Sequence, residues 1–196
     1  TILLLVALAA GTLAAPLGSF AQQQGKVWRV GFLAARHVDA LDSDVFGVFL
    51  RGMRELGYVE GKNLVIEWRF AEGSSERLSG LAAELVKLNV DVIVAAGTQA
   101  TSAAQKATTT IPIVIATAGD PVGSGFVKSL AHPGGNITGL SELTVDISPK
   151  HLEMLLSMVP KLSRVAVLVN PANSTTAATL TSVQAAAQKV RVNILP

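Results

Sequence analysis

Apolar and polar positions follow two alternating patterns along the first two thirds of the chain. Four short runs rich in β-branched residues predict buried strands. These runs are Val27 to Ala34, Asn63 to Phe70, Asp91 to Ala96 and Ile113 to Ala118. Between them, apolar residues recur every three or four positions, as in amphipathic helices. The clearest examples are Val45, Phe49, Met53 and Leu56 in one segment and Leu78, Leu81, Leu85 and Leu88 in another, with a weaker helical segment at 98–110.

Strands that are mostly apolar on both faces and separated by helices are typical of a parallel sheet covered on each side. The pattern therefore predicts an α/β fold with a doubly wound parallel sheet, in which these four strands are adjacent and parallel. One run, Asn63 to Phe70, alternates more clearly and predicts a strand with one side buried.

The pattern changes after residue 135. A short, turn-rich connector, "NITGLS", is followed by a predicted helix from about Pro149 to Met158. A new strand in "SRVAVLVNP", a helix over 174–190 and a strand opening in "RVNILP" come next. We interpret residues 26–143 as a first α/β lobe and residues 147–196 as the start of a second, truncated lobe, with the boundary near 141–148.

The N-terminal segment is apolar from Ile2 to Ala15, is broken by Pro16, and ends in "SFA" before "QQQ". A membrane span needs about 20 apolar residues, and this run is shorter. Small residues before a polar stretch are typical of a signal-peptidase site. We expect residues 1–21 to be a secretory signal cleaved near Ala21, the alternative being an uncleaved membrane anchor.

Composition and motifs narrow the range of functions. The net charge is only +2 and no run of Lys and Arg is present, so nucleic acid is not an expected partner. The chain has no Cys, which excludes disulfides, thiol catalysis and cysteine-ligated metals. No phosphate-loop, dinucleotide or nucleophile-elbow motif occurs, and the three His residues lack metal-ligand spacing. We therefore expect no enzyme activity, cofactor or metal.

Positional logic supplies the candidate site, because ligands of open parallel sheets bind beyond the carboxyl ends of the strands. Gly97 lets the backbone turn after the third strand, and the helix amides opening at Thr98 could hold a carboxylate. Asp120 lies in a stiff Gly-Asp-Pro turn after the fourth strand, where it could hold an ammonium group. The alternative is that Thr98 only caps its helix and Asp120 only caps its turn.

Several segments resemble one family in order and spacing. They are "RELGYVEGKNLVIEWRFAEGSSERLSGLAAELVKLNVDVIVAAGT", "TTTIPIVIATAGDPVGSGFVKSLAHPGGNITGLS" and "SRVAVLVNP". The chain resembles the ABC-transporter substrate-binding proteins whose studied members bind tryptophan or other aromatic amino acids. The resemblance implies a type I periplasmic binding protein: two α/β lobes around a cleft, a small-molecule solute, an ABC permease in the inner membrane as partner, and a periplasmic location. This chain departs from the family in length.

The resemblance also implies which residues face the solute. They come from the strand-end loops of the first lobe and one strand end of the second: Ala35, Arg36, Asp42, Gly97, Thr98, Gln99, Gly119, Asp120 and Asn170. Two other functions stay open at this point. One is a sensor or ligand-binding domain of a signalling system, and the other is an enzyme on a similar α/β fold.

Overall fold

The computed structural model describes residues 25–37 and 44–195. Its centre is a five-stranded parallel sheet with strand order β2-β1-β3-β4-β5. The strands are β1 (Trp28–Ala34), β2 (Leu64–Phe70), β3 (Val92–Ala96), β4 (Ile113–Thr117) and β5 (Ile137–Gly139). The four predicted strands are confirmed as adjacent and parallel. The predicted signal segment lies outside the described residues, and no described helix is long and apolar enough to cross a membrane.

The fifth strand corrects one expectation. The composition of "NITGLS" predicts a turn-rich connector, but Ile137 pairs with Ile113 and Gly139 with Ile115. A strand of three residues that contains a glycine offers no hydrophobic period to recognise. Its backbone pairing with β4 makes it a strand all the same.

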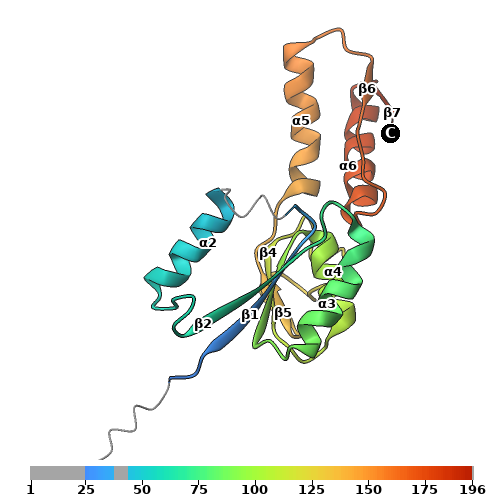
Figure 1. Cartoon of the computed structure of the whole chain (residues 1–196). Coiled ribbons are helices and arrows are strands. Elements are labelled where there is room, and N and C mark those ends of the chain that lie inside the picture. Colours follow the sequence, from blue (N-terminus) through green and yellow to red (C-terminus); the bar gives the residue numbers. More distant parts are fainter. Residues whose placement is uncertain (1–24, 38–43, 196) are drawn as a thin grey trace, which may run out of the picture.

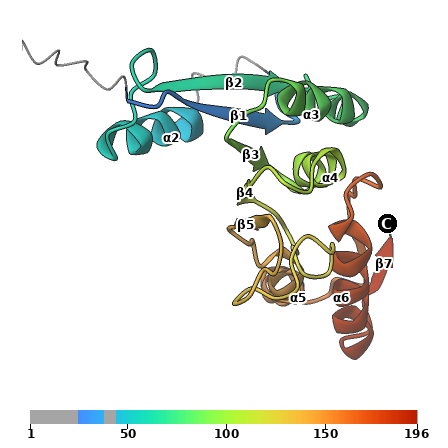
Figure 2. The same ribbon diagram turned by 90° about the horizontal axis from the view of Figure 1, so that it is seen from below.

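Helices cover both faces of the sheet, as the doubly wound prediction requires (Figures 1 and 2). The helix α2 (Asp44–Glu55) packs on one face, and α3 (Leu78–Lys87) and α4 (Thr98–Ala107) pack on the other. A short 3-10 turn, η2 (Ser75–Arg77), leads into α3. Leu33, Ile93 and Ile113 of the strands are fully buried under α3 and α4.

Aromatic rings hold α2 on its face of the sheet. The ring of Phe46 lies 5.2 Å from that of Phe32 and 5.6 Å from that of Phe70, centroid to centroid, in edge-on contacts. Trp68 lies 5.0 Å from Phe32 and stacks on Phe70. Such pairs add roughly 0.5–1.5 kcal/mol each beyond their buried area. The few aromatic residues of the chain are thus concentrated in one half of the core.

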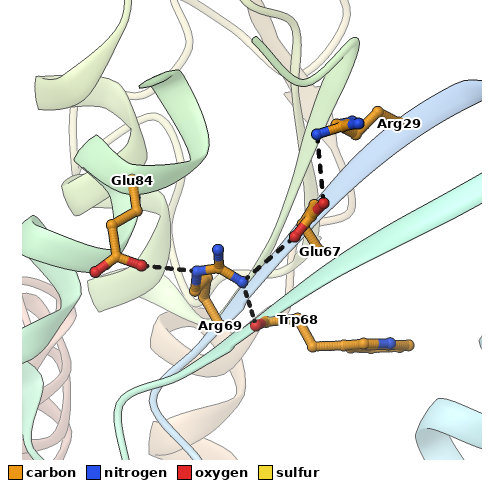
Figure 3. A network of polar contacts seen from close by, with 5 residues as sticks. All are labelled: Arg29, Glu67, Trp68, Arg69 and Glu84. Carbon is orange, nitrogen blue, oxygen red and sulfur yellow. Dashed lines mark hydrogen bonds and ion pairs between the residues drawn. The ribbon is translucent and has the colours of Figure 1, made fainter. Parts of the chain in front are cut away.

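Charged side chains occupy the opposite face of β1 and β2, beside α3. Arg29 Nη1 lies 3.5 Å from Glu67 Oε1, and Arg69 Nε donates to Glu84 Oε2 on α3 at 2.9 Å. Figure 3 shows Trp68 pointing away from this network, toward the face that α2 covers. The alternating pattern of Asn63 to Phe70 therefore reflects an apolar face under α2 and an ion-paired face beside α3.

The second unit stands beyond the carboxyl edge of the sheet (Figure 1). It consists of α5 (Thr144–Met158), β6 (Arg164–Ala166), α6 (Thr175–Lys189) and β7 (Asn193–Leu195), with β6 and β7 parallel. Leu152, Ala187 and Val192 form its small core. The predicted order of elements is confirmed, and the boundary between the lobes stays a prediction.

The helix α5 starts earlier than the sequence suggested. We predicted a start near Pro149 from the apolar spacing of Leu152, Leu155 and Leu156. The structure begins α5 at Thr144, and Pro149 lies inside it. The Ser148 hydroxyl donates to the Thr144 carbonyl at 2.5 Å, so this extra turn is tied together by a side chain.

Candidate functional site

The carboxyl ends of β1, β3 and β4 meet at one edge of the sheet. Ala34 pairs with Ala96, and Ala96 with Thr117, so the loops that follow these strands start side by side. The order β2-β1-β3 makes this a topological switch point, because the chain leaves β1 toward one side and β3 toward the other. The structure thus brings together the loops at Ala35, Gly97 and Gly119.

A hydrogen bond links the loops after β3 and β4. Thr98 is buried, and its Oγ1 accepts from the Gly119 backbone N–H at 3.3 Å. The Gly97 N–H donates to the Thr117 carbonyl at 3.0 Å. Gly97 has a φ of 102°, which confirms that the turn after β3 uses its conformational freedom. Thr98 therefore joins the two loops rather than projecting freely from one of them.

Asp120 shapes its own turn and also lines a pocket. Its Oδ1 accepts from the Gly123 N–H at 2.8 Å, and its carbonyl accepts from the Ser124 N–H at 2.9 Å. The side chain is half-buried and contributes to a cavity with an accessible volume of about 220 Å³. Turn capping and ligand contact are compatible here, because a carboxylate has two oxygens.

Two further carboxylates line the same pocket. These are Glu142, in the loop that follows β5, and Asp146, in the first turn of α5. Pro121, Val122, Leu130 and Leu143 supply apolar walls. Glu142 accepts from the Thr117 hydroxyl, and its backbone N–H donates to the Ala118 carbonyl at 2.7 Å. Three acidic side chains between apolar walls favour a cationic group with an apolar body.

Sequence reasoning missed Glu142 and Asp146. Glu142 follows the rule used for Asp120, since it lies just beyond the carboxyl end of a parallel strand. Because β5 was not predicted from the sequence, Glu142 could not be recognised as a residue that follows a strand. Asp146 was placed in the connector because the helix was expected to start later.

The loop after β1 is held by the loop after β2. The Ala35 carbonyl accepts from the Gly73 N–H at 2.8 Å, and the Arg36 carbonyl from the Glu72 N–H at 3.2 Å. His37 Nδ1 lies 2.7 Å from Glu72 Oε2. Arg36 is exposed at this rim, and Asp42 lies outside the described residues. The segment Ala71 to Gly73 is thus a part of the edge that sequence reasoning did not name.

Gln99 lies on another side of α4. It lines a smaller pocket of about 150 Å³ together with the start of α3 and Ala172 of the second unit. Its Nε2 is buried, and no hydrogen-bond partner for this atom is found in the described part of the chain.

The loop before α6 brings the second unit against Gly119. Asn170 is exposed, and its Oδ1 accepts from the Ala172 N–H at 3.0 Å, which shapes this loop. Ser174 Oγ lies 3.0 Å from Ser124 Oγ. Thr175 is buried so close to Gly119 that a Cβ at position 119 would lie 3.0 Å from Thr175 Cγ2. The first-lobe loop is thus contacted by Ser174 and Thr175, whereas Asn170, predicted at a strand end, lies in the loop beyond β6, which ends at Ala166. A solute contact of Asn170 stays a prediction.

A family model of the ABC transporter substrate binding proteins matches residues 30–196. The chain belongs to this family. The predicted resemblance is thereby confirmed, and the solved structures confirm the type I periplasmic binding fold. A conserved domain protein from Vibrio cholerae superposes with a TM-score of 0.79 at 32% identity, covering 87% of this chain and 56% of that one.

The names of two more similar proteins include a ligand. A "Tyrosine-binding protein" from Clostridioides difficile is 35% identical over 123 residues, which is 62% of this chain and 35% of that protein. An ABC domain from Streptococcus pneumonia in complex with L-Trp has a TM-score of 0.76 at 24% identity and shares the fold, covering 86% of this chain and 56% of that one. The chain spans about half the length of the two solved structures and about a third of the length of the tyrosine-binding protein.

Proposed function

We propose that this protein captures a small amino-acid solute, with aromatic amino acids as the first candidates, in the cleft between its two lobes. The observation that supports this most strongly is that carboxylates, which attract cations, and helix amides, which attract anions, lie at the same edge of the sheet. Asp120 and Glu142 line an acidic pocket, and the amino-terminal turn of α4 opens beside them through the bond between Thr98 and Gly119. No step of catalysis is needed for such a site to work.

An amino acid matches this pair of environments. Its ammonium group would be attracted by the carboxylates, and its carboxylate by the free amides and partial positive charge at the start of α4. The apolar walls at Val122, Leu130 and Leu143 suit a side chain with a large apolar body. The tyrosine-binding relative supports an aromatic amino acid as the first solute to test.

We further propose that the protein acts outside the cytoplasm and delivers its solute to an ABC permease in the inner membrane. Membership of the transporter family and the expected signal over residues 1–21 support this. Contact between the Asn170–Thr175 loop and Gly119 supports a cleft whose two walls come from different lobes. Closure around solute would then report occupancy to the permease.

A ligand screen on the full-length protein tests the proposal. Thermal unfolding would be followed with L-tyrosine, L-tryptophan, other amino acids, sugars and purines. A solute at a hundredfold excess over its Kd stabilises the protein by about 2.7 kcal/mol. Stabilisation by an amino acid that is recovered unchanged after incubation supports a binding protein. A response to sugars or purines but to no amino acid, or conversion of the ligand, would contradict it.

A further inference from the structure

A close contact between Gly119 and Thr175 joins the first unit to the second. Gly119 lies in the loop after β4, and Thr175 is the first residue of α6. Both residues are buried. The three atoms nearest to a Cβ added at Gly119 would all belong to Thr175: Cγ2 at 3.0 Å, Oγ1 at 3.2 Å and Cβ at 3.4 Å. The space that a side chain at position 119 would need is therefore filled by the second unit.

Each side of this contact is held by hydrogen bonds within its own unit. The Gly119 N–H donates to Thr98 Oγ1 at 3.3 Å. Asn173 Oδ1 accepts from the Thr175 N–H at 3.1 Å and from the Thr175 hydroxyl at 2.8 Å. A β-branched side chain has few χ1 rotamers, and this hydroxyl bond favours the one that Thr175 adopts. Extra volume at position 119 would therefore displace the two units rather than rotate one side chain.

The position of α6 affects the carboxylate pocket through α5. The two helices pack side by side (Figures 1 and 2), and the Ser182 hydroxyl of α6 donates to the Val145 carbonyl of α5 at 3.2 Å. Asp146 follows Val145 and lines the pocket together with Gly119 and Asp120. The pocket is thus lined from both units. How closely α6 approaches the first unit therefore bears on the distance between Asp146 and Asp120.

We propose that Gly119 and Thr175 are positioning residues that form the stop against which the second unit closes on the solute. This inference rests on the proposed function and concerns the width of the pocket, not the atoms that touch the solute. With glycine at position 119, α6 approaches closely enough for Asp120 and Asp146 to attract one cationic group. A side chain at position 119 holds the second unit away, and the attraction weakens with distance.

One substitution, one compensating change and one matched control test the stop. Gly119→Ala adds the Cβ, and because Gly119 has no positive φ, alanine meets no left-handed strain there. Thr175→Ala removes Cγ2 and Oγ1, while Asn173 Oδ1 still accepts from the backbone N–H at this position. Gly135→Ala is the control, since Gly135 is exposed, has no positive φ and has open space around it.

The first measurement needs no solute. Each variant is combined with Ser124→Cys and Ser174→Cys, because the hydroxyl oxygens of these serines lie 3.0 Å apart beside the contact. We expect Gly119→Ala to slow disulfide formation several-fold under a fixed oxidant, since a disulfide tolerates little displacement of its two residues. Adding Thr175→Ala should restore the rate, and Gly135→Ala should leave it unchanged. Equal rates in Gly119→Ala and Gly135→Ala would overturn the proposal.

The second measurement follows L-tyrosine, or the solute found in the screen, by stopped-flow with the serines intact. We expect Gly119→Ala to raise the dissociation rate roughly tenfold with little change in association, and Thr175→Ala to reverse this in the double variant. A loss that Thr175→Ala does not reverse, or a slower disulfide with unaltered solute kinetics, would overturn the stop. If no solute binds the parent, the proposed function fails, and the disulfide rates still decide whether Gly119 and Thr175 limit the approach of the units.

Discussion

Single polar residues at the strand ends make local structural contacts and, under the proposed function, also contact the solute. The sequence allows Thr98 and Asp120 to be either caps or ligand contacts, and the structure gives both a local partner. The Asp120 carboxylate caps its turn with Oδ1 and still lines a pocket. A substitution that keeps the cap but removes the charge is therefore more informative than truncation.

Asp120→Asn is that substitution, because the amide oxygen can still accept from the Gly123 N–H. We expect folding stability to change little and affinity for an amino acid to fall roughly tenfold to a hundredfold, since a charge-assisted contact is worth about 1.5–3 kcal/mol. Isothermal titration calorimetry on the full-length protein measures this. Glu55→Gln, an exposed change at the end of α2, serves as the control. Unaltered affinity in Asp120→Asn would show that the carboxylate is only a turn cap.

Two glycines make a second residue-scale test. Gly139 has a φ of 139°, and a Cβ there would collide with the backbone of Ile115. Gly80 lies exposed in α3 with open space around it. We expect Gly139→Ala to destabilise the protein by at least about 1–3 kcal/mol and Gly80→Ala to stabilise it by roughly 0.5–1 kcal/mol. Urea unfolding measures both, and equal effects at the two positions would contradict the close pairing of β5 with β4.

At the scale of elements, hydrophobic period predicted the four longer strands and the buried face of α3. On α2 it was wrong for Leu56, which lies beyond the end of the helix and is 75% exposed, while Phe46 supplies the buried centre of that face. Trp68 and Phe70 alternate with Glu67 and Arg69, and that alternation alone places one face in the core. The period could not find β5, whose three residues pair through their backbone with β4. Without β5, the sequence could not indicate Glu142 as a residue at the end of a strand. Gln99 was named from the resemblance, but its unpartnered amide emerges only once the chain packs around it.

An ion pair joins elements at the opposite edge of the sheet. Asp91, just before β3, accepts from the Arg29 backbone N–H at 2.8 Å and pairs with Lys26 at 2.6 Å. The hydrogen bond from Lys26, followed by that from the Arg29 backbone, holds the pKa of Asp91 below its ordinary value. Because the folded pKa is the lower one, this stabilisation is complete above the unfolded pKa of about 3.9 and is lost as pH falls through the folded pKa.

Asp91→Asn should therefore lower the free energy of unfolding at pH 7, and the gap to the parent should close below about pH 4. Denaturant unfolding across pH 2.5 to roughly pH 7 follows this gap. Glu153→Gln, in an exposed pair with Lys150, is the control and should cost less than about 1 kcal/mol. A gap between parent and Asp91→Asn that stays constant with pH would argue against the depressed pKa.

At the scale of the whole molecule, the second unit touches the first through a few small residues. Ser124 and Ser174 approach to 3.0 Å between hydroxyl oxygens, and Gly119 leaves room for Thr175. Small side chains allow two surfaces to meet without a large buried core. We therefore expect the contact to form and separate at low cost, as the proposed capture of a solute in a cleft would require.

A disulfide across this contact tests whether separation of the two units is needed for solute exchange. The chain contains no Cys, so Ser124→Cys with Ser174→Cys introduces a single possible bridge among its residues. The hydroxyl separation of 3.0 Å makes a bond of about 2.05 Å reachable with a small adjustment. We expect oxidation of protein loaded with L-tyrosine, or with the solute found in the screen, to slow release by roughly tenfold or more, a rise of at least about 1.4 kcal/mol in the barrier. Oxidation before loading should slow uptake, and a reductant should restore both rates in stopped-flow measurements.

Each single cysteine variant controls for the substitution itself. Equal exchange rates in the oxidised and reduced double variant, with the bridge verified by mass spectrometry, would mean that solute enters and leaves without parting Ser124 from Ser174.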